Sequence, residues 1–308
     1  MSVSKEIIDA VAKMQSLDLS TATEDDIRNV LKMIDGTALL TTAFPKGASI
    51  ARTRCVQDFY ESKILYERDI SYNPNADAVR IGRVNRDGQS VFYGVSLVGS
   101  SGSVLPRVVS FSETSTMVFD KSNDELEEYT VTGRWRAEET FNIVWFIHHQ
   151  QFAQPDPHIA QLRAGYEAML SRVPNYDDCV YVNEALAAEF AKDVPRGQGY
   201  GYGITSVIGK YLLEQLGCDA IGFPSVRAEG NGLNLAIHPR VLVSGKLKLE
   251  VVLVEHAYKF DKDVIAVPYL LCNQFHPDGK FIYEEQPLMT KAQLKQEILR
   301  SRDRKASS

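Results

Sequence analysis

The sequence has few cysteines, and their spacing excludes the usual cysteine-based sites. Only four of its 308 residues are cysteine, at Cys55, Cys179, Cys218 and Cys272, and no two of them form a C-x-x-C pair. Structural zinc sites and dithiol redox centres need closely spaced thiols, so neither is expected here. Scattered cysteines of this kind are typical of reduced, mostly buried thiols.

The sequence also lacks any long hydrophobic run. A membrane-spanning helix needs roughly 20 consecutive apolar residues, and no stretch approaches that length. Near the start, Lys5, Glu6, Asp9 and Lys13 interrupt the apolar residues, so no signal-peptide core is recognisable. The formal net charge of −6 disfavours broad nucleic-acid binding. We therefore expect a cytoplasmic protein with no membrane contact and no direct nucleic-acid binding.

Familiar nucleotide-binding and metal-binding patterns are missing as well. The glycines of residues 196–203 do not match G-x-G-x-x-G, and the spacing from Gly203 to Gly209 is one residue too long for a phosphate-binding P-loop. His148, His149 and His158 have no carboxylate at helical spacing, and adjacent histidines point to different sides of a helix. Packing therefore explains the histidines better than metal binding, and we expect no metal site.

Hydrophobic periodicity predicts an α+β fold. Hydrophobic residues make up 44% of the chain, enough to fill a sizeable core. Two helices are expected first, the second capped by Thr23, and later helices at 159–169, 182–194, 205–217 (capped by Thr205) and 291–305. Strands are expected at 38–42, 49–54, 90–95, 129–135, 219–223, 233–237 and 247–254. Because strands and helices do not alternate regularly, a doubly wound sheet is disfavoured.

These elements suggest how the chain is organised. We expect a helical extension over residues 1–45, one main domain over 46–285 and a charged C-terminal helix over 286–308. No repeat, low-complexity tract or clear linker divides the main part of the sequence.

Three groups of polar residues lie where packing alone does not require them. Arg83 lies in a Gly-Asn-Asp loop just before the strand with Tyr93, where it suits a phosphate beside a flat ring, although a solvated loop is an alternative. Glu113 lies among small hydroxyl residues and could equally be solvated or cap a helix. Ser225 follows a strand, and Asn234 lies within an apolar strand, so its amide must find backbone or ligand partners.

Taken together, these segments resemble the RES domain family. The resemblance rests on GRVNRDGQSVFYG, on the SET that contains Glu113, and on the stretch from YGITSVIGKYLLEQLGCDAIGFPSV to GLNLAI. It covers roughly Arg52 to Val254, and implies an ADP-ribosyltransferase-like core of small antiparallel sheets surrounded by helices. Two features depart from compact members of the family: residues 99–103 form an extra loop before Glu113, and the N-terminal helices are additional.

The resemblance implies NAD as the substrate and gives each site residue a role. Arg83 would clamp the pyrophosphate, and Tyr93 would stack on or bound the nicotinamide ring. Glu113 would stabilise positive charge on the ribose, and Ser225 would hydrogen-bond the ribose or the carboxamide. The expected catalytic residues are Glu113, Arg83 and Ser225, and the expected NAD-binding residues are Arg83, Tyr93, Tyr202, Ser225 and Asn234, with Thr205 in the same Y-x-x-T element.

The implied reaction breaks the bond between nicotinamide and ribose. Its transition state resembles an oxocarbenium ion, which a nearby carboxylate stabilises. Capture by water would make the protein an NAD glycohydrolase, the reading we favour, whereas capture by a side chain would make it a protein ADP-ribosyltransferase. A non-catalytic NAD-binding module stays open. Compact members resemble toxins held silent by a helix-turn-helix antitoxin, so the resemblance suggests such a partner, unless the N-terminal helices mask the cleft instead.

Overall fold

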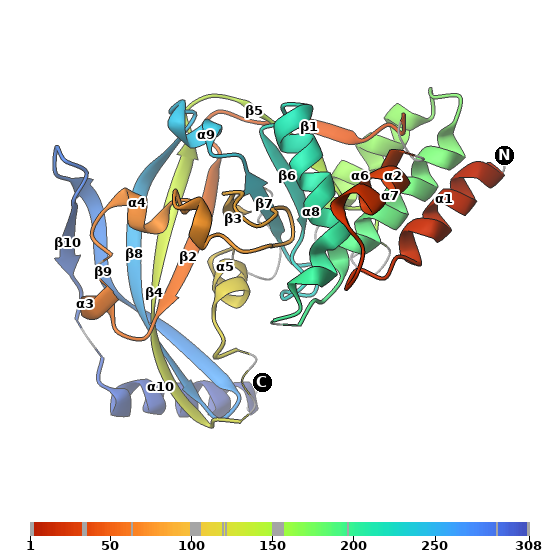
Figure 1. Cartoon of the computed structure of the whole chain (residues 1–308). Helices are drawn as coiled ribbons and strands as arrows, with labels where there is room; N and C mark the ends of the chain where they lie inside the picture. The colour runs from red at the N-terminus through yellow and green to blue at the C-terminus, as the bar shows by residue number, and fades with distance from the viewer. Residues whose placement is uncertain are drawn as a thin grey trace.

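A single ten-stranded sheet runs through the molecule in this computed structural model (Figure 1). The structure describes residues 3–32, 36–62, 64–98, 106–118, 120, 122–149, 157–195, 197–287 and 289–306. The strand order is β1-β5-β6-β7-β3-β2-β4-β8-β9-β10. Neighbouring strands are antiparallel except for the parallel pair β5 and β6. The predicted α+β class is confirmed, but one large mixed sheet replaces the small antiparallel sheets that we expected.

The strands are β1 (Leu40–Phe44), β2 (Ser49–Val56), β3 (Phe92–Ser96), β4 (Glu125–Ala137), β5 (Phe141–Trp145), β6 (Ala220–Pro224), β7 (Leu233–Ile237), β8 (Leu247–Phe260), β9 (Asp263–Phe275) and β10 (Phe281–Glu285). The α-helices are α1 (Lys5–Gln15), α2 (Glu24–Leu31), α3 (Phe59–Ser62), α4 (Glu67–Ile70), α5 (Pro106–Thr114), α6 (Pro157–Leu170), α7 (Tyr176–Ala191), α8 (Gly203–Lys210), α9 (Arg240–Val243) and α10 (Lys291–Ala306). Short 3₁₀ turns η2 (Ala76–Ala78) and η4 (Gly199–Tyr202) and the π-helical segment η5 (Tyr211–Gln215) complete the described elements.

One half of the molecule is built on the long strands β2, β4, β8 and β9. Strand β4 pairs with β2 on one edge and with β8 on the other, and Trp135 of β4 is fully buried against Phe92. Helix α10 lies across one end of these strands (Figure 1), where Leu294 and Ile298 pack against Tyr258. The predicted C-terminal helix therefore packs one of its faces, which carries Leu294 and Ile298, against the sheet.

The other half combines β1, β5, β6 and β7 with a layer of helices α1, α2, α6, α7 and α8 (Figure 1). The N-terminal helices bury Val11, Met14, Ile27 and Val30 in the same hydrophobic cluster as Phe190 of α7. Strand β1 pairs with β5, so the sheet begins before the boundary at residue 45 that the sequence suggested. The N-terminal helices thus share a core with the rest of the chain.

Local sequence signals explain where several elements begin and end. Thr23 caps α2 as predicted, in a capping box in which its side chain accepts a hydrogen bond from the backbone N–H of Asp26. The prediction of a strand at 233–237 is confirmed residue for residue. Thr205, in contrast, is not the cap of α8: the helix begins at Gly203, and the Thr205 hydroxyl donates to the Tyr202 carbonyl.

The histidine pair also differs from expectation. His148 and His149 follow β5 in an irregular segment, not a helix. Both ring nitrogens of His148 are buried and have no hydrogen-bond partner among the residues that the structure describes, and its ring lies 4.5 Å from that of Tyr166. Burial, with a smaller effect of nearby Arg163, lowers the pKa of His148 to about 4. The expected extra loop at 99–103 lies outside the described residues. No helix in the described part of the chain is long and apolar enough to cross a bilayer.

Candidate active site

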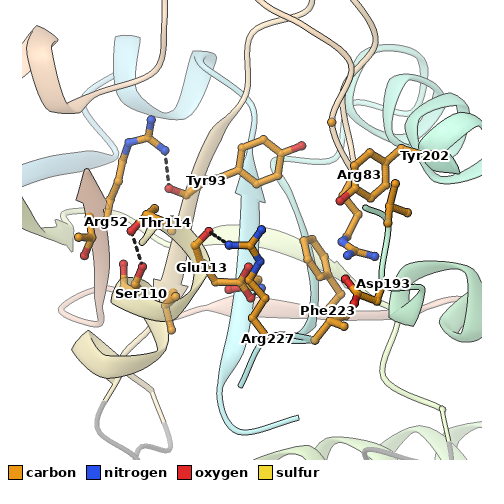
Figure 2. A pocket seen from close by; sticks show the side chains of 17 residues that line it. Arg52, Arg83, Tyr93, Ser110, Glu113, Thr114, Asp193, Tyr202, Phe223 and Arg227 are labelled. Atoms are coloured by element: carbon orange, nitrogen blue, oxygen red, sulfur yellow. Dashed lines mark hydrogen bonds between the residues drawn. The ribbon is translucent and has the colours of Figure 1, made fainter. Parts of the chain in front are cut away.

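A cavity of about 280 Å³ opens beside the middle of the sheet, and we call it the central cavity (Figure 2). Its walls come from β2, β3, β6 and β7, from helix α5, and from the segments that precede β3 and follow α7. The lining residues are Arg52, Thr53, Gly82, Arg83, Tyr93, Gly94, Val95, Ser110, Glu113, Thr114, Asp193, Val194, Tyr202, Phe223, Val226, Arg227 and Asn234.

Sheet register explains why distant residues meet on one wall. Asn234 of β7 lies opposite Val95 of β3 on one side and opposite Phe223 of β6 on the other. Directly opposed residues in antiparallel strands project to the same face of a sheet. These three side chains therefore form a row that faces the cavity, with the amide of Asn234 in its centre.

Glu113 lies in the last turn of α5, and two donors fix its carboxylate. The Ser225 hydroxyl donates to Oε1 at 2.6 Å, and the Asn234 amide donates to the same oxygen at 2.7 Å. Hydrogen bonds to an ionised carboxylate are stronger than neutral ones and hold its orientation. Among the described residues, the second oxygen, Oε2, has no hydrogen-bond partner. Glu113 therefore presents one anchored and one unengaged oxygen.

Ser225 holds the Glu113 carboxylate from a position outside the described cavity lining. It is fully buried directly after β6, and its hydroxyl also accepts a hydrogen bond from the backbone N–H of Ala228 at 3.1 Å. Because its hydroxyl proton is directed to Glu113 and the side chain does not line the cavity, the structure gives it a positioning contact. The contact with a ribose or carboxamide that we expected for Ser225 stays a prediction.

Tyr93 lines the cavity with its ring and uses its hydroxyl to hold the loop that carries Arg83. The hydroxyl accepts from the backbone N–H of Val84 and donates to Oδ1 of Asn85, both at 2.9 Å. Burial raises the pKa of Tyr93, so its hydroxyl stays protonated at neutral pH. The loop also lies against α8, where a Cβ built on Gly209 would be 2.0 Å from the Val84 carbonyl oxygen. Glycine at 209 is therefore required for this close approach.

Arg83 lies at the wall of the cavity that Tyr202 and Phe223 form. Its guanidinium donates to the carbonyl oxygens of Phe190 at 2.5 Å and Lys192 at 3.0 Å, and lies 5.1 Å from the ring centre of Tyr202 and 5.8 Å from that of Phe223. Arginine has five N–H donors, so these two bonds leave donors for a ligand. Arg83 and Tyr202, both expected to bind NAD, are thus brought together, whereas Thr205 is buried in α8 outside the described lining.

Two further arginines, Arg227 and Arg52, line the cavity. Arg227 donates from Nη1 to the carbonyl oxygens of Glu113 at 3.0 Å and Ser112 at 3.4 Å, which caps the C-terminal end of α5 (Figure 2). Arg52 donates to the carbonyls of Tyr93, Ile70 and Ser71. Its pKa is lowered by burial to about 9, which leaves it charged at neutral pH.

A signal for Arg227 was visible in the sequence, because it follows the strand, Pro and Ser that we did single out. Arg52 gave no comparable signal. It lies in a strand that contains other polar residues, and only the fold shows that its guanidinium donates to three backbone carbonyls.

The charge of the central cavity differs in sign from that of the whole chain. Its described lining holds three arginines, Arg52, Arg83 and Arg227, against the two carboxylates of Glu113 and Asp193. The chain itself carries a formal net charge of −6. A local excess of positive charge in an acidic protein attracts anionic ligands.

A second, larger depression continues from the central cavity, and we call it the adjoining groove. It has a volume of about 550 Å³ and shares the wall residues Asp193, Val194, Val226 and Arg227 with the central cavity. Small-molecule sites generally enclose about 300–1,000 Å³, so an extended ligand needs both spaces. Arg227 lies at the junction between them.

Comparisons with known proteins add no assignment. No protein-family model matches the chain, and no curated protein matches it. Within the described part of the chain, no three His, Cys, Asp or Glu side chains are arranged to hold a metal ion. The chemical reading of the site therefore depends on the residues themselves: one oriented carboxylate, three aromatic rings and three arginines around a concave space.

Proposed function

We propose that the protein cleaves NAD between nicotinamide and ribose and transfers the ADP-ribosyl group to water. One observation carries the proposal: Glu113, Arg83, Tyr93, Tyr202 and Asn234, far apart in the sequence, line one cavity, in which two donors orient the Glu113 carboxylate. These are residues that the resemblance to the RES domain family singles out. The proposal includes the family's ADP-ribosyltransferase-like core.

The residues around the cavity suit two parts of this substrate, the pyrophosphate and the nicotinamide ring. The pyrophosphate is a dianion, and arginine forks bind such oxygens through paired N–H donors. Arg83 and Arg227 line the central cavity, and Arg227 also lines the adjoining groove. The rings of Tyr93, Tyr202 and Phe223 offer flat apolar surface to nicotinamide.

The proposed chemistry balances without a further reactant except water. The bond between ribose C1′ and the nicotinamide nitrogen breaks, and its electron pair neutralises the pyridinium charge. The positive charge that develops on the ribose is stabilised by the carboxylate of Glu113, which is held in place before the reaction. Water then attacks C1′ and releases one proton to the solvent, giving ADP-ribose. Because nicotinamide leaves as a neutral molecule, its departure needs no general acid.

The direct experiment is to incubate the purified chain with NAD and measure nicotinamide release. We expect release by the wild type and a loss of roughly 10²–10³-fold in kcat for Glu113→Gln, the range found when one preorganised electrostatic contact is removed. Glu139→Gln is the matched control, since Glu139 is exposed in the turn after β4. Equal release by Glu113→Gln and the control would refute the assigned site.

The same assay separates the two alternatives. Free ADP-ribose equal to released nicotinamide supports hydrolysis, whereas an added ADP-ribose mass on a protein identifies a protein ADP-ribosyltransferase. NAD binding by calorimetry without any turnover identifies a non-catalytic nucleotide-binding module. A helix-turn-helix antitoxin partner stays part of the proposal, and co-expression with a candidate partner followed by the release assay tests it.

A further inference from the structure

The N-terminal helices contact the elements that carry the cavity residues, although the described lining of the central cavity contains no residue of α1 or α2. Helix α2 packs on α8: a Cβ built on Gly203, the first residue of α8, would lie 3.3 Å from Cδ1 of Ile27. Ile27 and Val84 are buried in the same hydrophobic cluster. Because Val84 directly follows Arg83, this cluster connects α2 and α8 to the backbone that carries Arg83.

Glu24, in the first turn of α2, contacts cations from three parts of the chain. Its Oε1 lies 2.5 Å from Nη2 of Arg28, one turn further along α2, and 3.0 Å from Nζ of Lys210, the last residue of α8. Its Oε2 lies 3.6 Å from Nε of Arg86. All four side chains are only 26–34% exposed, and partly buried pairs are screened less by salt than exposed ones. Glu24 therefore connects α2 both to α8 and to Arg86.

Arg86 belongs to the loop that holds Arg83, residues 80–89, which we call the Arg83 loop. The Asn85 amide donates to the carbonyl oxygens of Arg80 at 2.9 Å and Arg86 at 3.0 Å. The backbone N–H of Gly82 donates to the Asn85 carbonyl at 2.9 Å. These bonds connect the backbone on both sides of Arg83, so a displacement of Arg86 also shifts Arg83.

Further contacts attach the Arg83 loop to α8 and η5. Nη1 of Arg86 donates to the Ser206 hydroxyl at 3.4 Å, and the Gln89 amide donates to Oε1 of Glu214 at 2.9 Å. The backbone N–H of Arg86 donates to Oε1 of Gln89 at 3.1 Å. Because these contacts stay in place when the contact with Glu24 is lost, we expect that loss to displace the loop partly and not to unfold it.

From these contacts we infer that Glu24 is a positioning residue for Arg83. Through Arg86 it holds the Arg83 loop so that the guanidinium of Arg83 lies at the wall of the central cavity. The inference rests on the proposed function, in which Arg83 binds the pyrophosphate of NAD. It gives the N-terminal helices a supporting role, in contrast to the mask over the cleft that the sequence left open.

Calorimetric titration of the full-length protein with ADP-ribose tests the inference, because this probe carries the pyrophosphate and needs no turnover. Glu24→Gln should weaken ADP-ribose binding by about threefold to fivefold, the range expected for loss of a partly exposed ion pair. Asp25→Asn is the matched control, since Asp25 is exposed in the same turn of α2 and its substitution removes the same charge. It should leave the affinity unchanged.

A double variant shows whether Glu24 acts through Arg86. Arg86→Gln should weaken ADP-ribose binding by the same factor as Glu24→Gln, and combining the two should cause no further loss, because both remove one interaction. Arg86→Gln keeps the contacts of Glu24 with Arg28 and Lys210, so it can be measured even if Glu24→Gln does not fold.

Kinetics separate positioning from a purely structural role. Pyrophosphate contacts are present in the bound substrate as well as in the transition state, so their weakening raises KM and leaves kcat unchanged. Glu24→Gln should therefore raise KM for NAD by about threefold to fivefold at constant kcat. A contribution of Glu24 to stability alone would change neither KM nor the ADP-ribose affinity of the folded protein.

Failure of the inference and failure of the proposed function give different results. If the wild type binds ADP-ribose but releases no nicotinamide, the proposed reaction is wrong, and the affinities of the variants still decide the role of Glu24. Equal affinities of Glu24→Gln and Asp25→Asn, or additive losses in the double variant, would overturn the inference. Tighter binding by Glu24→Gln, which a mask over the cleft predicts, or a wild type that binds no ADP-ribose would overturn it as well.

Discussion

The contact between Gly209 and the loop of Val84 makes a sharp prediction about stability and about the site. A Cβ at position 209 would lie 2.0 Å from the Val84 carbonyl oxygen, 2.7 Å from its Cγ1 and 2.8 Å from its carbonyl carbon. The first and last of these are backbone atoms, so rotation of a side chain cannot relieve the overlap. In Gly209→Ala, the loop that carries Arg83 must move away from α8 by about 1 Å or more.

The expected cost follows from the contacts that hold this loop. Overpacking a tightly packed site costs about 1–3 kcal/mol, and the backbone overlap places this change at the upper end. Displacing Val84 also strains its hydrogen bond to the Tyr93 hydroxyl, which contributes about 1 kcal/mol. Alanine is favoured over glycine within a helix by about 1 kcal/mol, which offsets part of the loss. We therefore expect a decrease of about 3 kcal/mol in the free energy of unfolding.

Urea unfolding followed by circular dichroism measures this change. Gly165→Ala in α6 is the matched control, because a Cβ there has no neighbour within 4 Å. It should stabilise the protein by about 0.5–1 kcal/mol through helix propensity alone. If Gly209→Ala were as stable as Gly165→Ala, the close packing of the loop on α8 would be wrong. A smaller loss of stability with a large loss of NAD cleavage would still support displacement of Arg83.

Three further predictions test the site and the fold. Ser225→Ala removes one of the two donors to Glu113 and should lower kcat/KM for NAD by about tenfold to a hundredfold. Ser112→Ala, in the same helix as Glu113, should leave kcat/KM unchanged, because the Ser112 hydroxyl donates to the Val108 carbonyl. For His148, the pKa of about 4 in the folded protein is lower than its value of about 6.5 when unfolded, so the unfolded chain binds more protons and stability falls as pH drops from about 6.5 to 4. His148→Phe should remove about 3 kcal/mol of that fall, measured as the difference between urea unfolding at pH 7 and at pH 4 for variant and wild type. Thr23→Ala should cost about 1 kcal/mol of unfolding free energy through loss of the capping box, and an unchanged urea midpoint would contradict that role.

Local patterns in the sequence predict some of the elements, whereas β5, β9, β10 and helix α5 are not predicted. A short apolar run after a glycine-rich loop locates β7, and a threonine followed by acidic residues locates the start of α2, because both signals depend only on neighbouring residues. The helix expected at 205–217 begins earlier, at Gly203, and continues as the π-helical segment η5, which the hydrophobic periodicity does not reveal. The strand order and the joining of all ten strands into one sheet depend on contacts between distant segments.

The site residues also divide into those that local sequence signals reveal and those that only contacts between distant segments reveal. Asn234 could be recognised from the sequence because an amide in an apolar strand needs a partner, and the structure supplies Glu113 as that partner. The inward position of Ser225 could not be predicted, because it depends on the turn in which its hydroxyl meets the N–H of Ala228. Arg52 was equally hidden, since its carbonyl partners come from residues 70, 71 and 93 on other parts of the chain.

The long separation of Glu113 from its serine partner has a consequence for translation. The two residues are 112 positions apart, and ribosomes add roughly 5–20 residues per second, so Ser225 is made about 6–22 s after Glu113. During that interval the nascent chain has α5 but neither donor for the carboxylate. A translation product that stops before β6 therefore lacks both donors to Glu113, and the carboxylate can be held in place only once the hairpin of β6 and β7 has left the exit tunnel.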